Sequence, residues 1–88
     1  MKQNMYFVEI TDTFGGEANY SWVTRHCVTA STMRGAMWKV SHDSGLSWHC
    51  VGGYDYAMRY DSKSGATCAF ITDWDNDIHS QYSHINKI

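Results

Sequence analysis

The side chains best suited to metal binding or nucleophilic chemistry form two His-Cys pairs, His26-Cys27 and His49-Cys50, together with Cys68. Zinc favours histidine and cysteine ligands. Neighbours in a strand, however, point to opposite faces of the sheet, so neither pair can chelate an ion from one strand. The C-x₂-C spacing that structural zinc sites use is also missing from the sequence. The pattern therefore favours buried cysteines and polar strand histidines, and it predicts no metal site.

A cysteine nucleophile needs a thiolate beside a base, together with an oxyanion donor. Cys27, Cys50 and Cys68 all fall within expected strands, where a free cysteine usually behaves as a small buried hydrophobe. No glycine elbow or helix start follows any of them. We therefore expect no catalytic residue, no cofactor and no enzymatic activity.

The acidic run Asp73-Trp74-Asp75-Asn76-Asp77 resembles the opening of a calcium loop. Such a loop needs glycine at its sixth position and a bidentate glutamate at its twelfth, where this chain has Ile78 and His84. Two alternatives remain. In an extended segment the three carboxylates would line one side at ~6.6 Å spacing and face a basic partner. Otherwise the run is a solvated end of the chain.

Aromatic residues make up 15% of this 88-residue chain. A domain of this size buries only about 60–65% of the surface that its unfolded chain exposes, so some of the aromatic rings should stay in contact with solvent. Exposed Tyr and Trp side chains supply large, rigid contact area at low entropic cost. We therefore predict a partner-binding surface of aromatic anchors and acidic groups, formed by Trp22, Trp38, Tyr56, Asp73, Trp74, Asp75 and Asp77.

Trp38 lies off the apolar stripe of an expected helix and one turn after Arg34, so a cation–π contact is available. An exposed helical tryptophan is either covered by the C-terminal tail or serves as an interface anchor. A second aromatic row, in an expected strand, fits the core, a protein contact or a platform for bases. Base platforms have basic surroundings, which the neighbouring aspartates do not provide. The row consists of Tyr54, Tyr56, Met58 and Tyr60.

The formal net charge is −2 and the isoelectric point is about 6.1, so direct binding of nucleic acid is not favoured. Three cysteines are an odd number, which fits a reducing compartment better than a secreted disulfide framework. The sequence shows neither a secretory leader nor an apolar run of membrane-spanning length. We expect a cytoplasmic protein that does not bind membranes.

Strand patterns occur at residues 5–12, 19–30, 46–51, 54–61 and 66–72. Turns are expected at Phe14-Gly15-Gly16, at Gly52-Gly53 and at residues 62–65. Ser31 is the expected N-cap of the single helix, which ends at Gly45. The apolar stripe of that helix has i, i+3, i+4, i+7 spacing and consists of Met33, Ala36, Met37 and Val40.

This order predicts an α+β fold, ββαβββ, with a five-stranded antiparallel sheet and one helix packed on one face. The simplest arrangement places the third strand beside the first, in the order 2-1-3-4-5. Residues 1–74 would form a single domain, and residues 75–88 a polar C-terminal tail or cap. An uncovered sheet face or edge could bind a partner or form a homodimer.

The layout resembles that of small phage-encoded proteins and, more loosely, the small anti-CRISPR inhibitors of bacteriophages. The similarity covers residues 1–74 as a pattern: the opening strand MYFVEITD, a glycine turn, a strand ending in VTA, the helix STMRGAMWKV and a meander of hairpins. It transfers no residue role. The resemblance implies a non-enzymatic inhibitor in the host bacterial cytoplasm. Such a protein binds a CRISPR-Cas-like defence complex and blocks nucleic-acid access or nuclease recruitment.

Two other functions compete with this one. A small nucleic-acid-binding or regulatory module could use an aromatic sheet face, although the chain has no basic cluster to support it. An enzyme acting through Cys or His chemistry would need a thiol with a depressed pKa.

Overall fold

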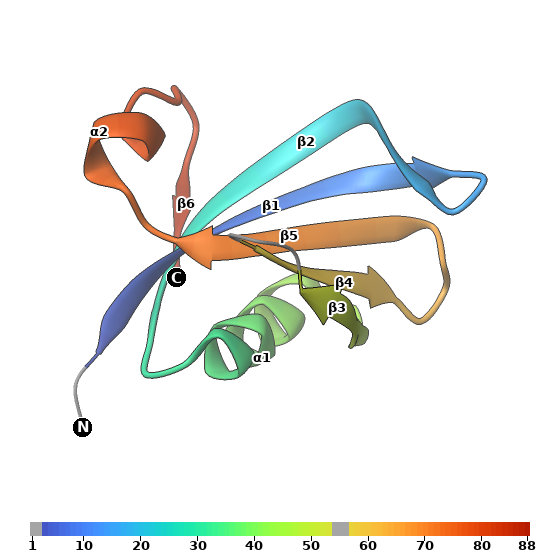
Figure 1. Ribbon diagram of the computed structural model, residues 1–88, viewed down its shortest axis with the longest axis horizontal. Coiled ribbons are helices and arrows are strands. Elements are labelled where there is room, and N and C mark those ends of the chain that lie inside the picture. Colours follow the sequence, from blue (N-terminus) through green and yellow to red (C-terminus); the bar gives the residue numbers. More distant parts are fainter. Residues whose placement is uncertain (1–2, 54–56) are drawn as a thin grey trace.

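The computed structural model describes residues 3–53 and 57–88, which build one sheet and two helices (Figure 1). The sheet has six strands in the order β3-β4-β5-β1-β2-β6. In chain order the elements are β1 (Asn4–Phe14), β2 (Glu17–Ala30), α1 (Met33–Ser44), β3 (Trp48–Gly53), β4 (Met58–Ser62), β5 (Thr67–Asp73), α2 (Asn76–His79) and β6 (Asn86–Lys87).

The α+β class is confirmed, but the predicted strand order and strand number are wrong. β1 pairs with β5, from Tyr6 opposite Asp73 to Asp12 opposite Thr67, and not with β3. Both of these strands are apolar and largely buried, so they occupy the middle of the sheet, where both faces are covered. β3 is mostly exposed and lies at one edge. The sixth strand, β6, pairs in parallel with β2, so the sheet is mixed.

The predicted turn at Gly15-Gly16 is confirmed, since both glycines have positive φ angles of 63° and 85°. The turn predicted at Gly52-Gly53 is wrong. These glycines belong to β3 and pair with Arg59 and Met58, after a register shift that follows Cys50. The expected strand at 54–61 falls partly outside the described residues, and the observed β4 begins at Met58.

Helix α1 begins one residue later than expected. Thr32 is the N-cap, because its φ of −142° is extended and its side chain accepts a hydrogen bond from the Gly35 amide at 2.9 Å. Ser31 was therefore the wrong cap. Gly45 ends the helix in the left-handed conformation, as predicted, with a φ of 72°.

The main core lies between α1 and one face of the sheet. Alternate residues of β1 point to this face, and Ala36, Met37 and Val40 of the predicted stripe are buried against it. Met33 is only partly buried at the edge of this cluster, and Met58 of β4 is similarly placed. The β1 side chains of the cluster are Tyr6, Val8 and Ile10.

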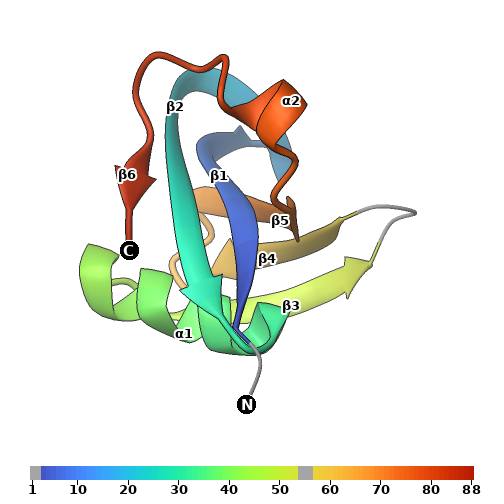
Figure 2. The same ribbon diagram turned by 90° about the vertical axis from the view of Figure 1, so that its left-hand side faces the viewer.

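The C-terminal segment covers the other face of the sheet, so that β1 and β2 lie between α1 and α2 (Figure 2). The Phe7 ring stacks on His79, with ring centroids 4.0 Å apart, and on Tyr82 at 5.6 Å. Arg25 lies over the Tyr82 ring at 4.1 Å and forms a 3.2 Å ion pair with Glu9. Residues 75–88 thus pack against the sheet as a cap.

Candidate protein-binding groove

The acidic run bends where β5 ends, so its carboxylates do not form the extended row that was one of the two alternatives. The amide of Trp74 still bonds to the Met5 carbonyl at 3.0 Å, as the strand ends. Asp75 then caps α2, and its side chain accepts a hydrogen bond from the Asp77 amide at 3.0 Å. One carboxylate of the run therefore has a structural role, while Asp73 and Asp77 are exposed.

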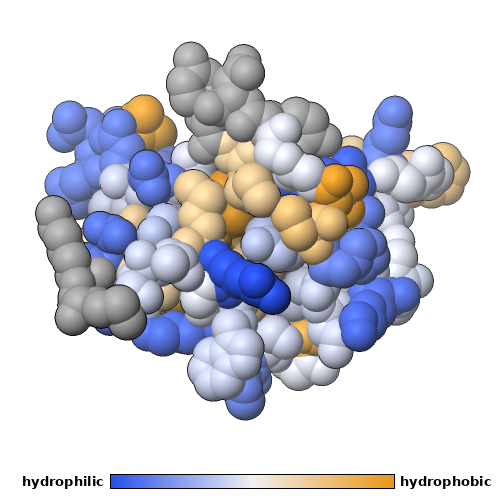
Figure 3. All heavy atoms as spheres, turned by 60° about the horizontal axis from the view of Figure 1, so that its bottom comes forward, coloured by the Kyte–Doolittle hydropathy of each residue, from blue (hydrophilic) through white to orange (hydrophobic). Residues whose placement is uncertain are grey.

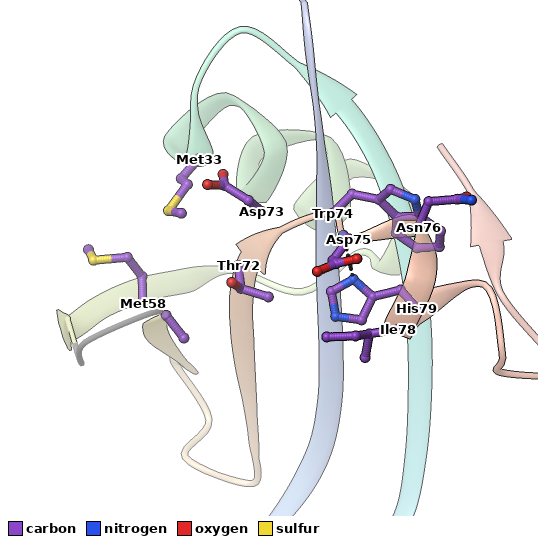
Figure 4. Close-up of a pocket in the computed structure, with 10 residues that line it drawn as sticks. Met33, Met58, Thr72, Asp73, Trp74, Asp75, Asn76, Ile78 and His79 are labelled. Carbon is purple, nitrogen blue, oxygen red and sulfur yellow. Dashed lines mark hydrogen bonds between the residues drawn. The ribbon is translucent and has the colours of Figure 1, made fainter.

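His79 holds this bend in place from within α2. The Asp75 amide donates a hydrogen bond to His79 Nδ1 at 2.9 Å, which the close-up marks with a dashed line (Figure 4). Burial lowers the pKa of His79, because the charged imidazolium loses its hydration in this aromatic environment. The imidazole is therefore neutral at pH 7, with Nδ1 as a hydrogen-bond acceptor.

An open cleft of about 870 Å³ lies beside the bend. Met33 and Met58 are on one side of it, and Trp74, Ile78 and His79 are on the other (Figure 4). The walls come from α1, from β4 and from the segment that joins β5 to α2. The polar residues of the lining are Thr72, Asp73, Asp75 and Asn76.

A second hollow, of about 670 Å³, continues from the first between α1 and the strands β3 and β4. Met33 and Met58 line both hollows, so the two adjoin at these side chains, and we call the pair of hollows the methionine groove. Figure 3 shows apolar side chains gathered across the middle of the face that carries α1. The second hollow adds Arg34, Met37, Trp38, Trp48, Cys50 and Tyr60 to the lining.

Three tryptophans border the groove in different ways. Trp38 is 63% exposed, and its ring packs on His42 with centroids 4.1 Å apart. The cation–π contact expected with Arg34 is not among the ring contacts of the described residues. Trp48 and Trp74 are partly buried, and their indole N–H groups find no acceptor within the described part of the chain. Trp38 is therefore the most exposed of the three rings, and Trp48 and Trp74 are held by packing without an indole hydrogen bond.

The groove brings together four of the predicted contact residues, since Trp38, Asp73, Trp74 and Asp75 all line it. Asp77 lies beside them on α2 but does not line either hollow. Trp22 is 44% exposed on β2, away from the groove. Tyr56 lies outside the described residues.

The cysteines and histidines do not gather into a site. Cys27 and Cys68 are buried as expected, and burial raises the pKa of both thiols. Cys50 is exposed in the wall of the groove, so the expectation of burial is wrong for this residue. His26 is buried, which lowers its pKa. Within residues 3–53 and 57–88, no three metal-ligating side chains come together.

The pairing of β1 with β2 contains a bulge near the hairpin turn, where the register shifts between Thr11 and Thr13, and sequence reasoning did not predict it. Tyr20 has a φ of 56°, a left-handed conformation that a tyrosine seldom adopts. Hydrogen bonds from Ser21 and Asn19 to Asp12 hold the bulge, and they lower the pKa of Asp12 to about 2. The bulge leaves Tyr20 and Trp22 exposed near Phe14.

Sequence reasoning also missed the residues that join the two hollows. Met33 belonged to the predicted core stripe, and Met58 to an alternating strand. Only the folded arrangement, in which α1 and β4 border the same core cluster, leaves both methionines half-buried at the surface. No pattern in the sequence indicates that these two methionines line the same hollows, because they are far apart along the chain.

Comparison with protein-family models, with curated proteins and with solved structures found no match for this chain. Among the described residues, no helix is long and apolar enough to cross a membrane.

Proposed function

We propose that this chain is a non-enzymatic, stoichiometric inhibitor that binds a host defence complex of the CRISPR-Cas type in the bacterial cytoplasm. By binding, it blocks nucleic-acid access or nuclease recruitment. The observation that supports a contact surface is the methionine groove, which carries Trp38 in one hollow and the acidic bend at Asp73 and Trp74 in the other. The choice of target rests on the resemblance to small phage inhibitors.

The groove offers two kinds of interaction to such a target. Its methionines are flexible and polarizable, so they adapt to the shape of an apolar segment. Trp38 can supply a central anchor, and truncating such an anchor typically costs 2 kcal/mol or more of binding free energy. The exposed carboxylates of Asp73 and Asp77 would compete with phosphates for Lys and Arg side chains on a nucleic-acid-binding protein.

The competing functions have less support. A cysteine nucleophile needs a lowered thiol pKa, whereas burial raises the pKa of Cys27 and Cys68. An aromatic platform for bases would need free cations, but Arg25 is paired with Glu9, and Arg59 forms a 2.9 Å ion pair with Asp61. The C-terminal cap also covers Phe7 on the sheet face that such a platform would use.

The decisive experiment is capture of partners from bacterial lysate on the immobilised protein, with and without nuclease treatment. We expect one nuclease-resistant protein complex, identified by mass spectrometry. Trp38→Ala should reduce capture at least tenfold, because tenfold corresponds to only about 1.4 kcal/mol and the loss of an anchor residue typically costs about 2 kcal/mol or more. Trp22→Ala is the matched control, an exposed tryptophan outside the groove.

Recovery of nucleic acid alone would contradict the proposal and favour the nucleic-acid-binding alternative. Loss of the complex with Trp22→Ala but not with Trp38→Ala would move the contact to β2 and away from the groove.

A further inference from the structure

The methionine groove is apolar along its middle, and the polar groups that it carries differ between the two hollows. Asp73 and Asp75 line only the first hollow, and Arg34 lines only the second. The two methionines shared by both hollows separate the carboxylates from the guanidinium. No ion pair to Arg34 occurs in the described part of the chain. An occupant of the whole groove therefore meets negative charge in one half and positive charge in the other.

An extended peptide does not suit this surface. β4, which forms one wall, is hydrogen-bonded to β3 on one side and to β5 on the other, so it has no free edge for an added strand. β3 does form an edge of the sheet, but a register shift between Cys50 and Gly52 interrupts it. The groove thus presents side chains rather than backbone groups to an occupant.

A helix laid in a groove uses side-chain contacts, with apolar anchors at i, i+3, i+4 and i+7. A helix also has a partial positive charge at its N-terminus and a partial negative charge at its C-terminus. The half with Asp73 suits the first of these ends, and the half with Arg34 suits the second. Asp77 adds a further exposed carboxylate beside the first hollow, so basic side chains on the occupant are favoured there.

We propose that the methionine groove receives a basic amphipathic α-helix of the partner protein, with its N-terminal turn beside Asp73 and its C-terminal turn beside Arg34. This inference rests on the proposed function, and it names the chemistry of the segment that the groove binds. The apolar stripe of the helix packs on Met33, Met58 and Trp38. Its Lys and Arg side chains face the carboxylates of the first hollow.

Two synthetic helical peptides of ~18 residues test this proposal, a length at which a helix can form. Both have blocked termini and the same stripe of Leu and Phe, and one carries Lys where the other carries Glu. We expect fluorescence anisotropy at low salt to show binding of the Lys peptide that is at least about tenfold tighter. Equal affinity for the two peptides, or no binding of the Lys peptide, would overturn the proposal.

Protein variants locate the binding site. Asp73→Asn combined with Asp77→Asn should remove most of the difference between the peptides, and so should high salt. Asp75 stays unchanged in this variant because it caps α2. Trp38→Ala should weaken the binding of both peptides, whereas Trp22→Ala should leave the binding of both unchanged. If Trp22→Ala weakens them as much as Trp38→Ala does, the peptides bind elsewhere and the proposal is wrong.

A spin label on the first residue of the Lys peptide tests the orientation. It should broaden the indole N–H signal of Trp74 more than that of Trp38, and the reverse result would reject the proposed direction.

The peptide test and the capture experiment distinguish failure of the basic-helix proposal from failure of the proposed inhibitor function. If capture of the complex depends on Trp38 while the Lys peptide does not bind, the inhibitor function stands and the basic helix is rejected. If neither experiment shows binding that depends on Trp38, the groove is not the contact surface and both proposals fail.

Discussion

Thr32 shows how one hydroxyl sets the start of α1. Its side chain accepts the Gly35 amide, and its carbonyl accepts the Ala36 amide at 2.9 Å, as the first turn of a helix requires. Ser31 has the same chemistry one residue earlier, and sequence preference alone does not separate the two. In the folded chain Thr32 occupies the cap position, and Ala36, Met37 and Val40 of the same helix face the sheet.

We predict that Thr32→Ala lowers the free energy of unfolding by about 1 kcal/mol, since an N-cap hydroxyl typically contributes this much. Ser31→Ala is the matched control and should change the free energy much less. Urea denaturation followed by circular dichroism measures both variants. An equal loss in the two variants would mean that the two hydroxyls share the cap.

The C-terminal cap and β2 each contain a buried histidine that links folding to pH. Burial lowers the pKa of His79 and of His26, so both are favoured in the neutral form when the chain is folded. The unfolded chain has histidines near their ordinary pKa of about 6.5 and binds more protons below that value. The contribution of these two histidines to folding stability is therefore full above about pH 6.5, and it falls as the pH drops from there toward the lowered pKa values.

We predict that His79→Phe reduces the loss of folding stability between about pH 7.5 and about pH 5.5. This window spans the ordinary histidine pKa of about 6.5. Phenylalanine keeps a ring beside Phe7 and cannot be protonated. His26 remains in this variant, so a smaller dependence on pH should persist. Urea denaturation at the two pH values is the measurement, and His42→Phe, at an exposed position of α1, is the control. If the pH dependence of the free energy of unfolding is unchanged in His79→Phe, protonation of His79 is not coupled to folding.

At the scale of the whole molecule, the first strand lies in the middle of the sheet and the last residues of the chain form one of its edges. The final residue participates directly, because the Ile88 amide donates to the Cys27 carbonyl at 2.9 Å and the Thr29 amide donates to the Ile88 carbonyl at 3.2 Å. Ile88 also packs against the main core. The expected domain boundary after residue 74 would thus cut through a layer of packed side chains.

We predict that truncation after Trp74 destabilises the protein. Uncovering Phe7 alone should cost about 2–3 kcal/mol, by the free energy of burying a phenylalanine side chain. The truncated chain also loses the pairing of β6 with β2. Urea denaturation of the full and truncated chains gives the difference. An unchanged midpoint would mean that residues 1–74 fold independently and that the cap adds little.

Local patterns in the sequence were sufficient for the elements that depend on near neighbours. The stripe of α1, its stop at Gly45 and the turn at Gly15-Gly16 follow from side-chain spacing and from backbone preference. The same holds for the approximate positions of the strands in the described residues. The position of Trp38 off the stripe followed as well, but cover by the C-terminal tail was left open, and the structure leaves the side chain 63% exposed.

The arrangement of these elements depended on contacts between distant parts of the chain. β1 and β5 both need cover on two faces, and that shared need places them side by side in the centre. Tyr20 adopts an unfavourable φ because, on the neighbouring strand, Thr11 accepts a hydrogen bond from its amide and Asp12 accepts one from the Ser21 amide. The methionine groove arises in the same way, because α1, β4 and the bend before α2 meet only in the folded chain. The spacing of residues along the sequence does not indicate which distant elements come into contact, so the tertiary structure alone determines the groove.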